Sequence, residues 1–170
     1  LAAAYRLVDY FGWSELIFGH LTVRIPGDKP HFLINPYGLN YEEVKASNLI
    51  KIDVDGNIIG QSDYPVNQAG FVIHSSIHMA NSNVNKCVMH THTRAGMAIA
   101  AIKEGLQSVS MSSTGFHNRL SYHDYEGVSL YEDERPRLLH NLGENKAMIL
   151  RNHGLLVVGR TVAETFIRLY

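Results

Sequence analysis

The stretch Lys86-Cys-Val-Met-His-Thr-His92, KCVMHTH in one-letter code, is an apolar run that ends in two histidines separated by one residue. A short run of this kind predicts a buried strand, along which side chains alternate between the two faces of a sheet. His90 and His92 therefore point the same way, with Cα atoms roughly 6.5 Å apart. Two imidazoles at this spacing can bind one metal ion, because each metal–nitrogen bond is only about 2 Å long.

A third ligand is expected from Asn152-His153-Gly154, at the junction of two predicted strands. The glycine would let the backbone turn sharply and leave the imidazole of His153 at the rim of the sheet. Three histidines with one open coordination position are typical of a catalytic metal site rather than a closed structural one. An isolated pair of histidines also arises by chance, and a core histidine with a backbone partner is the alternative for either of them.

Working outward from this strand, periodicity predicts helices and strands over most of the chain. Helices are expected at 1–10, 70–81, 94–102, 134–142 and from Thr161 onward, where Thr161 and Glu164 form a capping-box pattern. Strands are expected at 20–25, 31–35, 86–92, 107–111, 147–152 and 155–158, with a hairpin over 49–59 that turns at 55–57. The segment that ends at Gly127 is interpreted as a long loop. This mixture predicts a layered α/β domain with a largely antiparallel sheet.

The composition limits the classes of protein to which the chain can belong. The 170 residues suit one domain, 1–170, and the 15 basic and 16 acidic residues are scattered, so a nucleic-acid partner is not expected. No apolar run approaches the length of a membrane span. The single cysteine excludes an internal disulfide framework, and the first residues do not resemble a signal peptide, which favours the cytoplasm. The chain starts without methionine and stops inside a predicted helix, so truncation at both ends is expected.

Four segments carry a more specific pattern, namely His90-Thr-His-Thr-Arg-Ala-Gly96, Gly70-Phe-Val-Ile-His-Ser-Ser-Ile-His78, Tyr122-His-Asp-Tyr-Glu-Gly127 and Leu150-Arg-Asn-His-Gly-Leu-Leu-Val-Val-Gly159. Together they resemble the class II aldolase/adducin family. The resemblance covers nearly the whole chain and includes Gly19-His-Leu-Thr22. It implies a three-layer α/β/α fold with a central, largely antiparallel sheet, and assembly as a homo-oligomer, commonly a tetramer.

The same resemblance implies the chemistry. In catalytic members a divalent ion, usually Zn²⁺, is held by three histidines that match His90, His92 and His153; Mn²⁺ or another divalent ion is the alternative. Bound to the oxygens of a hydroxycarbonyl substrate, the ion acts as a Lewis acid and stabilises the enediolate left by C–C cleavage.

One residue departs from the aldolase pattern. The aldolases use a glutamate at the start of the helix that precedes the two histidines, and this position falls at Gly70. No Asp or Glu occurs between Asp63 and Glu104, so a shift of the alignment cannot restore it. The glycine makes the chain more similar to the adducin branch, which includes cytoskeletal proteins whose domain need not catalyse a reaction.

The serines that phosphate-specific members of the family carry before that glutamate are missing as well, because Asn67-Gln-Ala69 stands at these positions. We expect a small hydroxycarbonyl or hydroxy-acid substrate without a phosphate group. The expected substrate-binding residues are Gly19, Thr22, Gly38, Asn67 and Gln68.

A group that moves protons remains to be identified. The candidates are His123, Tyr125 and Glu126, in the loop that carries several such groups, although a purely structural loop is the alternative. His74 and His78 share a helix face, where core or interface packing is favoured over a role as supporting partners or as a proton relay. His20 and His31 lie near strands that could border the cleft, although an exposed or edge position is favoured for both. Three functions follow: a metal-dependent lyase, a decarboxylase or epimerase on the same metal, and a non-catalytic adducin-like module for assembly or protein binding.

Overall fold

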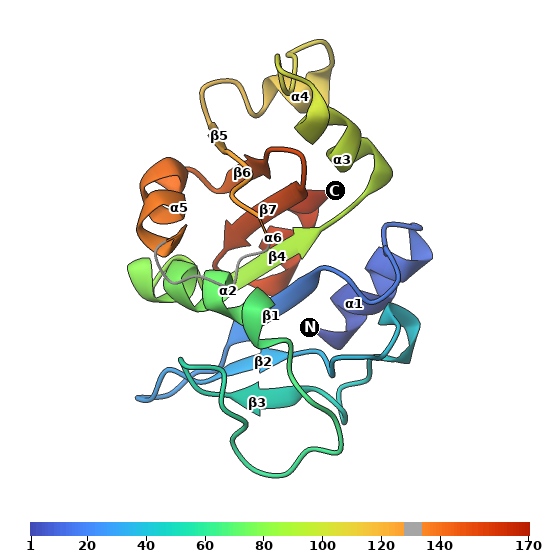
Figure 1. Ribbon diagram of the computed structural model, residues 1–170, viewed down its shortest axis with the longest axis vertical. Helices are drawn as coiled ribbons and strands as arrows, with labels where there is room; N and C mark the ends of the chain where they lie inside the picture. The colour runs from blue at the N-terminus through green and yellow to red at the C-terminus, as the bar shows by residue number, and fades with distance from the viewer. Residues whose placement is uncertain (128–133) are drawn as a thin grey trace.

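The computed structural model describes residues 1–127 and 134–170, in which helices pack on both faces of one seven-stranded sheet (Figure 1). The strands are β1 (His20–Arg24), β2 (Phe32–Ile34), β3 (Ile50–Ile52), β4 (Cys87–Thr91), β5 (Leu120–His123), β6 (Ala147–Leu150) and β7 (Gly154–Gly159). The helices are α1 (Ala2–Tyr10), α2 (Gln68–Ala80), α3 (Arg94–Ala101), α4 (Met111–Thr114), α5 (Glu134–Leu142) and α6 (Val162–Leu169), with a 3₁₀ turn η1 (Tyr41–Glu43).

The strand β4, which contains His90, lies at the centre of the sheet. The strand order is β3-β2-β1-β4-β7-β6-β5, and every described pair is antiparallel except β5 with β6. This confirms the largely antiparallel sheet. His90 of β4 is paired with His20 of β1 on one side and with Leu156 of β7 on the other.

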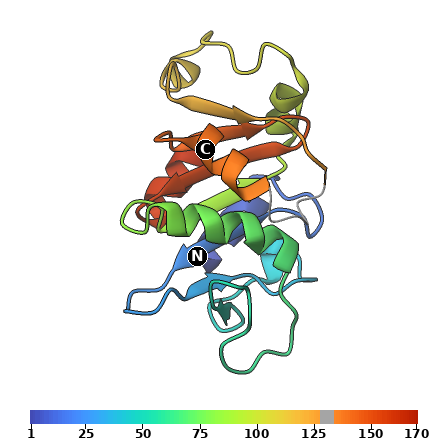
Figure 2. The same cartoon turned by 60° about the vertical axis from the view of Figure 1, so that its left-hand side comes forward.

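Apolar clusters on both faces of the sheet hold the layers together. On one face Met89 and Cys87 pack with residues of α1 and α6, and on the other Val88 packs with residues of α2 and α5. Neighbouring residues of β4 thus serve opposite clusters, as the alternation of a strand requires. Figures 1 and 2 show α2 and α5 on the face opposite to α6. The predicted three-layer α/β/α fold is confirmed.

Side-chain caps set the starts of the helices that border the site. Asn67 accepts a hydrogen bond from the Gly70 backbone N–H at the start of α2 (3.2 Å), and Thr93 accepts one from Gly96 at the start of α3 (2.9 Å). Each cap satisfies a backbone donor that has no partner inside its helix.

The described residues contain no helix with the length and apolar character of a membrane span.

The predictions for 107–127 and 49–59 were wrong in part. A strand was expected at 107–111, but Ser110 caps the short helix α4 there. The segment expected to be a loop contains β5, which pairs in parallel with β6, a strand distant in sequence. In the predicted hairpin, the return after β3 is a single bridge between Ile52 and Ile58 rather than a second strand. Asp53 forms the turn, since its carboxylate accepts hydrogen bonds from two backbone N–H groups.

Candidate metal centre

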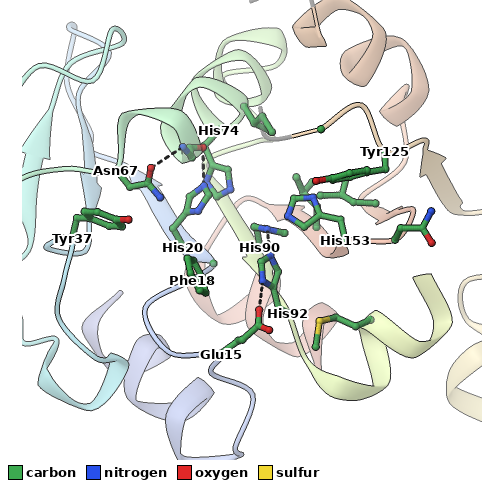
Figure 3. A pocket seen from close by; sticks show the side chains of 18 residues that line it. Glu15, Phe18, His20, Tyr37, Asn67, His74, His90, His92, Tyr125 and His153 are labelled. Carbon is green, nitrogen blue, oxygen red and sulfur yellow. Dashed lines mark hydrogen bonds and ion pairs between the residues drawn. The ribbon is translucent and has the colours of Figure 1, made fainter. Parts of the chain in front are cut away.

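Three histidines from separate parts of the chain meet where the end of β4 lies beside the start of β7 (Figure 3). His90 lies in β4, His92 follows its end, and His153 lies in the turn between β6 and β7. Their ring centroids are 4.7 Å (90–92), 4.6 Å (90–153) and 4.9 Å (92–153) apart. One nitrogen from each ring lies within 4.8 Å of the other two. The structure thus brings together the residues that the sequence singled out.

The turn that places His153 depends on an asparagine. Asn152 has φ +55°, in the left-handed region that asparagine tolerates better than most residues, and its N–H donates to the Ala100 carbonyl (3.0 Å). The expectation that Gly154 makes this turn was wrong, because Gly154 starts β7. A Cβ atom there would lie 2.6 Å from the Thr91 carbonyl oxygen, so Gly154 instead permits the close approach of β4 and β7.

Oxygen acceptors fix which nitrogens of His90 and His92 carry protons. Nδ1 of His90 lies 2.9 Å from the Leu155 carbonyl oxygen, and Nδ1 of His92 lies 2.6 Å from the Glu15 carboxylate. These oxygens only accept, so both Nδ1 atoms donate and the Nε2 atoms are left with lone pairs. The two Nε2 atoms are 2.9 Å apart. Two lone pairs at this distance repel, so the arrangement calls for one cation between them, either a proton or a metal ion.

The surroundings keep most of these rings uncharged. Burial, followed by the neighbouring histidines, lowers the pKa of His90 well below its ordinary value. Burial and then His92 lower the pKa of His153 to about 4, while Glu15 acts in the opposite direction. Uncharged imidazoles are the form that binds metal ions, and an oxygen partner on the second ring nitrogen is the usual support of a histidine ligand. The donor set therefore fits a divalent ion.

The histidines form part of the wall of a cavity of about 600 Å³, large enough for a small organic ligand. Its wall also includes aromatic, aliphatic and amide side chains, but neither lysine nor arginine among the described residues. The lining residues are Glu15, Phe18, Gly19, His20, Tyr37, Asn67, Gly70, Ile73, His74, His90, His92, Met97, Tyr125, Gly127, Leu150, Asn152, His153 and Leu156.

Comparison with known proteins decides the family. The family model for the class II aldolase and adducin N-terminal domain matches residues 1–170. The chain belongs to this family. A crystal structure of an aldolase II superfamily protein from Pseudomonas syringae superposes with a TM-score of 0.96 at 47% identity, and covers 99% of this chain and 68% of that one.

Both branches of the class II aldolase/adducin family are represented among the similar proteins. L-fuculose 1-phosphate aldolase from Glaciozyma antarctica PI12 superposes with a TM-score of 0.87 at 34% identity, over 99% of this chain and 67% of that one. Alpha-adducin from Rattus norvegicus is 47% identical over 169 residues, which are 98% of this chain and 23% of that protein. Two proteins named as aldolase class 2 proteins, from Caulobacter vibrioides and Pseudomonas aeruginosa, are 47% and 46% identical to this chain over 170 residues. The chain spans 66% and 65% of their lengths.

Of the five residues expected to bind substrate, Gly19 and Asn67 line the cavity of this family member. Thr22 does not, because α2 covers its side chain completely and its hydroxyl is bonded to two histidines of that helix. Gly38 and Gln68 are exposed and lie outside the cavity lining, although Tyr37, next to Gly38, belongs to it. The cavity lining thus includes two of the five predicted residues, and their role in binding a substrate stays a prediction.

The three candidates for proton transfer are placed differently. Tyr125 lines the cavity, and its ring centroid is 6.2 Å from that of His153. His123 lies outside the lining, because it is buried and its Nε2 and Nδ1 contact Glu134 (3.3 Å) and Asn141 (2.9 Å). Glu126 also lies outside it and forms a two-pronged ion pair with Arg137. Only Tyr125 is positioned to contact a ligand beside the triad.

Sequence reasoning missed three residues of this site. His20 and His74 are buried in the cavity wall, whereas an exposed or edge position was favoured for His20 over one that borders the cleft, and packing was favoured for His74 over a supporting role. Glu15 lies in an irregular segment, and no sequence pattern indicates its contact with His92. The antiparallel pairing of predicted strands could have suggested His20, because pairing β1 with β4 sets it beside His90.

Proposed function

We propose that this domain binds a divalent metal ion, with Zn²⁺ as the first candidate, through His90, His92 and His153, and that it acts as a lyase on a small hydroxycarbonyl or hydroxy-acid compound. The main support is the pair of fixed Nδ1 donors, which leaves the Nε2 atoms of His90 and His92 facing each other at 2.9 Å. His153 adds a third uncharged ring at 4.6 Å and 4.9 Å. A packed core has no need of such an arrangement.

The residues around the triad suit a small oxygenated ligand. When bound, the ion supplies a Lewis acid for the ligand's oxygens. Glu15 orients the imidazole of His92 and compensates part of the added positive charge. Asn67 uses its side-chain oxygen to cap α2, so its amide N–H₂ group is the part that can donate to a ligand oxygen in the cavity. Tyr125 is our candidate for the proton donor, because its phenol is in the cavity beside His153.

The missing carboxylate keeps the reaction type open within this proposal. Gly70 occupies the position of the aldolase glutamate and lines the cavity without a side chain. C–C bond cleavage with Tyr125 as the acid is the first candidate, and decarboxylation or epimerisation on the same three histidines is the alternative. L-fuculose 1-phosphate aldolase, which shares 34% identity, supports the choice of a lyase.

A second candidate function is a non-catalytic module for assembly or protein binding. It is favoured by Gly70 together with the 47% identity to rat alpha-adducin.

Both functions are compatible with a homo-oligomer. We propose a tetramer, which light scattering would test. A cytoplasmic location belongs to the proposal as well, supported by the one cysteine, which is buried in the core.

Metal analysis and turnover separate the two functions. We expect close to one divalent ion per chain in protein purified without added metal, loss of that ion in His90→Ala, and retention in the matched control His140→Ala, whose side chain is exposed on α5. Hydroxy-aldehydes, hydroxy acids and their phosphates would then be assayed for cleavage. Metal-free protein that is indifferent to His90→Ala would contradict the enzyme and favour the assembly module.

A further inference from the structure

The imidazole of His20 occupies the space that a side chain at position 70 would need. A Cβ atom on Gly70 would lie 2.5 Å from Cε1 and 2.8 Å from Nδ1 of that ring, closer than carbon atoms approach without displacement. The ring is held there by a hydrogen bond from Nε2 to the Gly70 carbonyl oxygen (2.7 Å). His20 and Gly70 are therefore a matched pair, in which an imidazole from β1 occupies the space of a side chain from α2. Figure 3 shows the His20 ring in the cavity, next to His74.

This imidazole presents an acceptor. Because the Gly70 carbonyl only accepts, Nε2 of His20 carries the proton, and Nδ1 of the uncharged ring has a lone pair. Within the described part of the chain, Nδ1 has no hydrogen-bond partner. The ring lines the cavity and lies 5.6 Å from that of His90, measured between centroids, so it is a neighbour of a ligand that is bound at the triad.

A buried chain of hydrogen bonds ends at His74, whose ring lies next to that of His20. The Asn85 carbonyl oxygen accepts from Nδ1 of His78 (2.6 Å), so Nε2 of His78 accepts the Thr22 hydroxyl proton (2.8 Å). Thr22 has one proton to give, and its oxygen must therefore accept from Nδ1 of His74 (2.7 Å). Nε2 of His74 is then a second bare acceptor, buried and without a partner among the described residues, on a ring 4.0 Å from that of His20.

We propose that His20 is the residue that determines specificity in this cavity, and that it selects an unphosphorylated polyhydroxy ligand by accepting a hydrogen bond from one of the ligand's hydroxyl groups at Nδ1. This inference rests on the proposed function, since the ligand is anchored at the three histidines. A hydroxyl group donates to such a wall, whereas the oxygens of a phosphate dianion only accept. The described lining has no lysine or arginine to neutralise a phosphate, and it contains the carboxylate of Glu15.

A matched pair of ligands tests this selection. D-Glycerate and 3-phospho-D-glycerate share the carboxylate and the adjacent hydroxyl that can chelate an ion, and differ only at the third carbon. Calorimetric titration of the zinc-loaded chain should show at least tenfold tighter binding of D-glycerate. His20→Ala should weaken D-glycerate binding roughly tenfold, as expected for the loss of one hydrogen bond, and should reduce the preference by the same factor. His20→Phe, which keeps a ring without an acceptor, should behave similarly, and His31→Ala, outside the cavity lining, should behave as the parent.

Equal or tighter binding of the phosphate, unchanged binding in His20→Ala, or zinc-loaded parent that binds neither compound would overturn the inference while the metal site stands. A parent that binds no zinc would overturn the proposed function and, with it, the ligand selection.

The packing of His20 on Gly70 has its own test, which requires no metal. Gly70→Ala should lower the Tm of the parent, because its Cβ meets the His20 ring, but should raise the Tm in a His20→Ala background, where only the helix-favouring effect of alanine remains. An equal decrease in both backgrounds would show that the two residues are not matched.

Discussion

The free energy of unfolding of the metal-free chain should fall as the pH falls from about 6.5 to about 4. The protonation of His78 accounts for one part of this loss, which a substitution at this position can measure. The His78 side chain has no exposed surface, and burial is the main cause that lowers its pKa from 6.5 to about 4. The nearby Arg24 acts in the same direction, while the hydrogen bond to the Asn85 carbonyl acts against it. At pH 7 the ring is uncharged in the folded chain and mostly uncharged in the unfolded chain, so little of this stability is lost there.

Below pH 6.5 the unfolded chain takes up a proton on this ring and the folded chain does not, so protons favour unfolding. Stability from this source is complete above 6.5 and is lost progressively down to about 4. Since each pH unit corresponds to about 1.4 kcal/mol, the contribution of His78 to the loss is about 3 kcal/mol. Nδ1 of His78 already donates to the Asn85 carbonyl oxygen and Nε2 accepts the Thr22 hydroxyl proton, so a proton added at Nε2 would displace the hydrogen bond from Thr22.

Urea denaturation of the parent and of His78→Gln at several pH values between 7 and 4 measures this contribution. At pH 7 the variant should be less stable by about 1–3 kcal/mol, since it disturbs two buried hydrogen bonds. The gap between parent and variant should close or reverse toward pH 4, because only the parent carries the titrating ring at position 78. His140→Gln, on the exposed face of α5, is the control for replacing a helical histidine. A constant gap across the whole pH range would refute the reasoning.

Three further outcomes are expected. Glu15→Ala should weaken Zn²⁺ binding about 10- to 100-fold in a competition assay with a chelating dye, because it removes the oxygen that orients His92, whereas Glu42→Ala on the exposed 3₁₀ turn should have no effect. Gly154→Ala should lower both the Tm and the Zn²⁺ affinity, since its Cβ would lie 2.6 Å from the Thr91 carbonyl oxygen and 3.0 Å from the His92 ring; unchanged affinity would contradict this placement. Thr22→Val should cost about 1–3 kcal/mol of unfolding free energy in urea, because His74 and His78 both lose their hydroxyl partner, and a loss below about 0.5 kcal/mol would argue against the bridge.

Local patterns were sufficient for much of the fold. The apolar run before His90 predicted the central strand, and the 3.6-residue periodicity of 70–81 and 134–142 predicted α2 and α5. The spacing of His90 and His92 predicted that their rings would share a face, and the rings do meet. Each of these predictions depends on residues that are close in sequence, so the period of the pattern carries the information.

The segment 107–127 shows where local patterns end. Its serine-rich start resembles neither a strong helix nor a strand, and β5 exists because β6 offers it a parallel partner. A short strand of this kind is stabilised by its neighbour rather than by its own composition, and the neighbour follows in sequence only after α5. The pairing could not be read from the segment itself.

For the site, the sequence by itself determined that three histidines were available to meet and that no carboxylate could stand at position 70. The tertiary structure alone decided that the His20 ring fills that position, that Glu15 reaches His92, and that α2 seals Thr22 away from the cavity. These contacts join residues separated by 50 or more positions, namely 20 with 70, 15 with 92, and 22 with 74. Strand order and helix placement bring such residues together, and neither is encoded in the spacing of side chains along a single element.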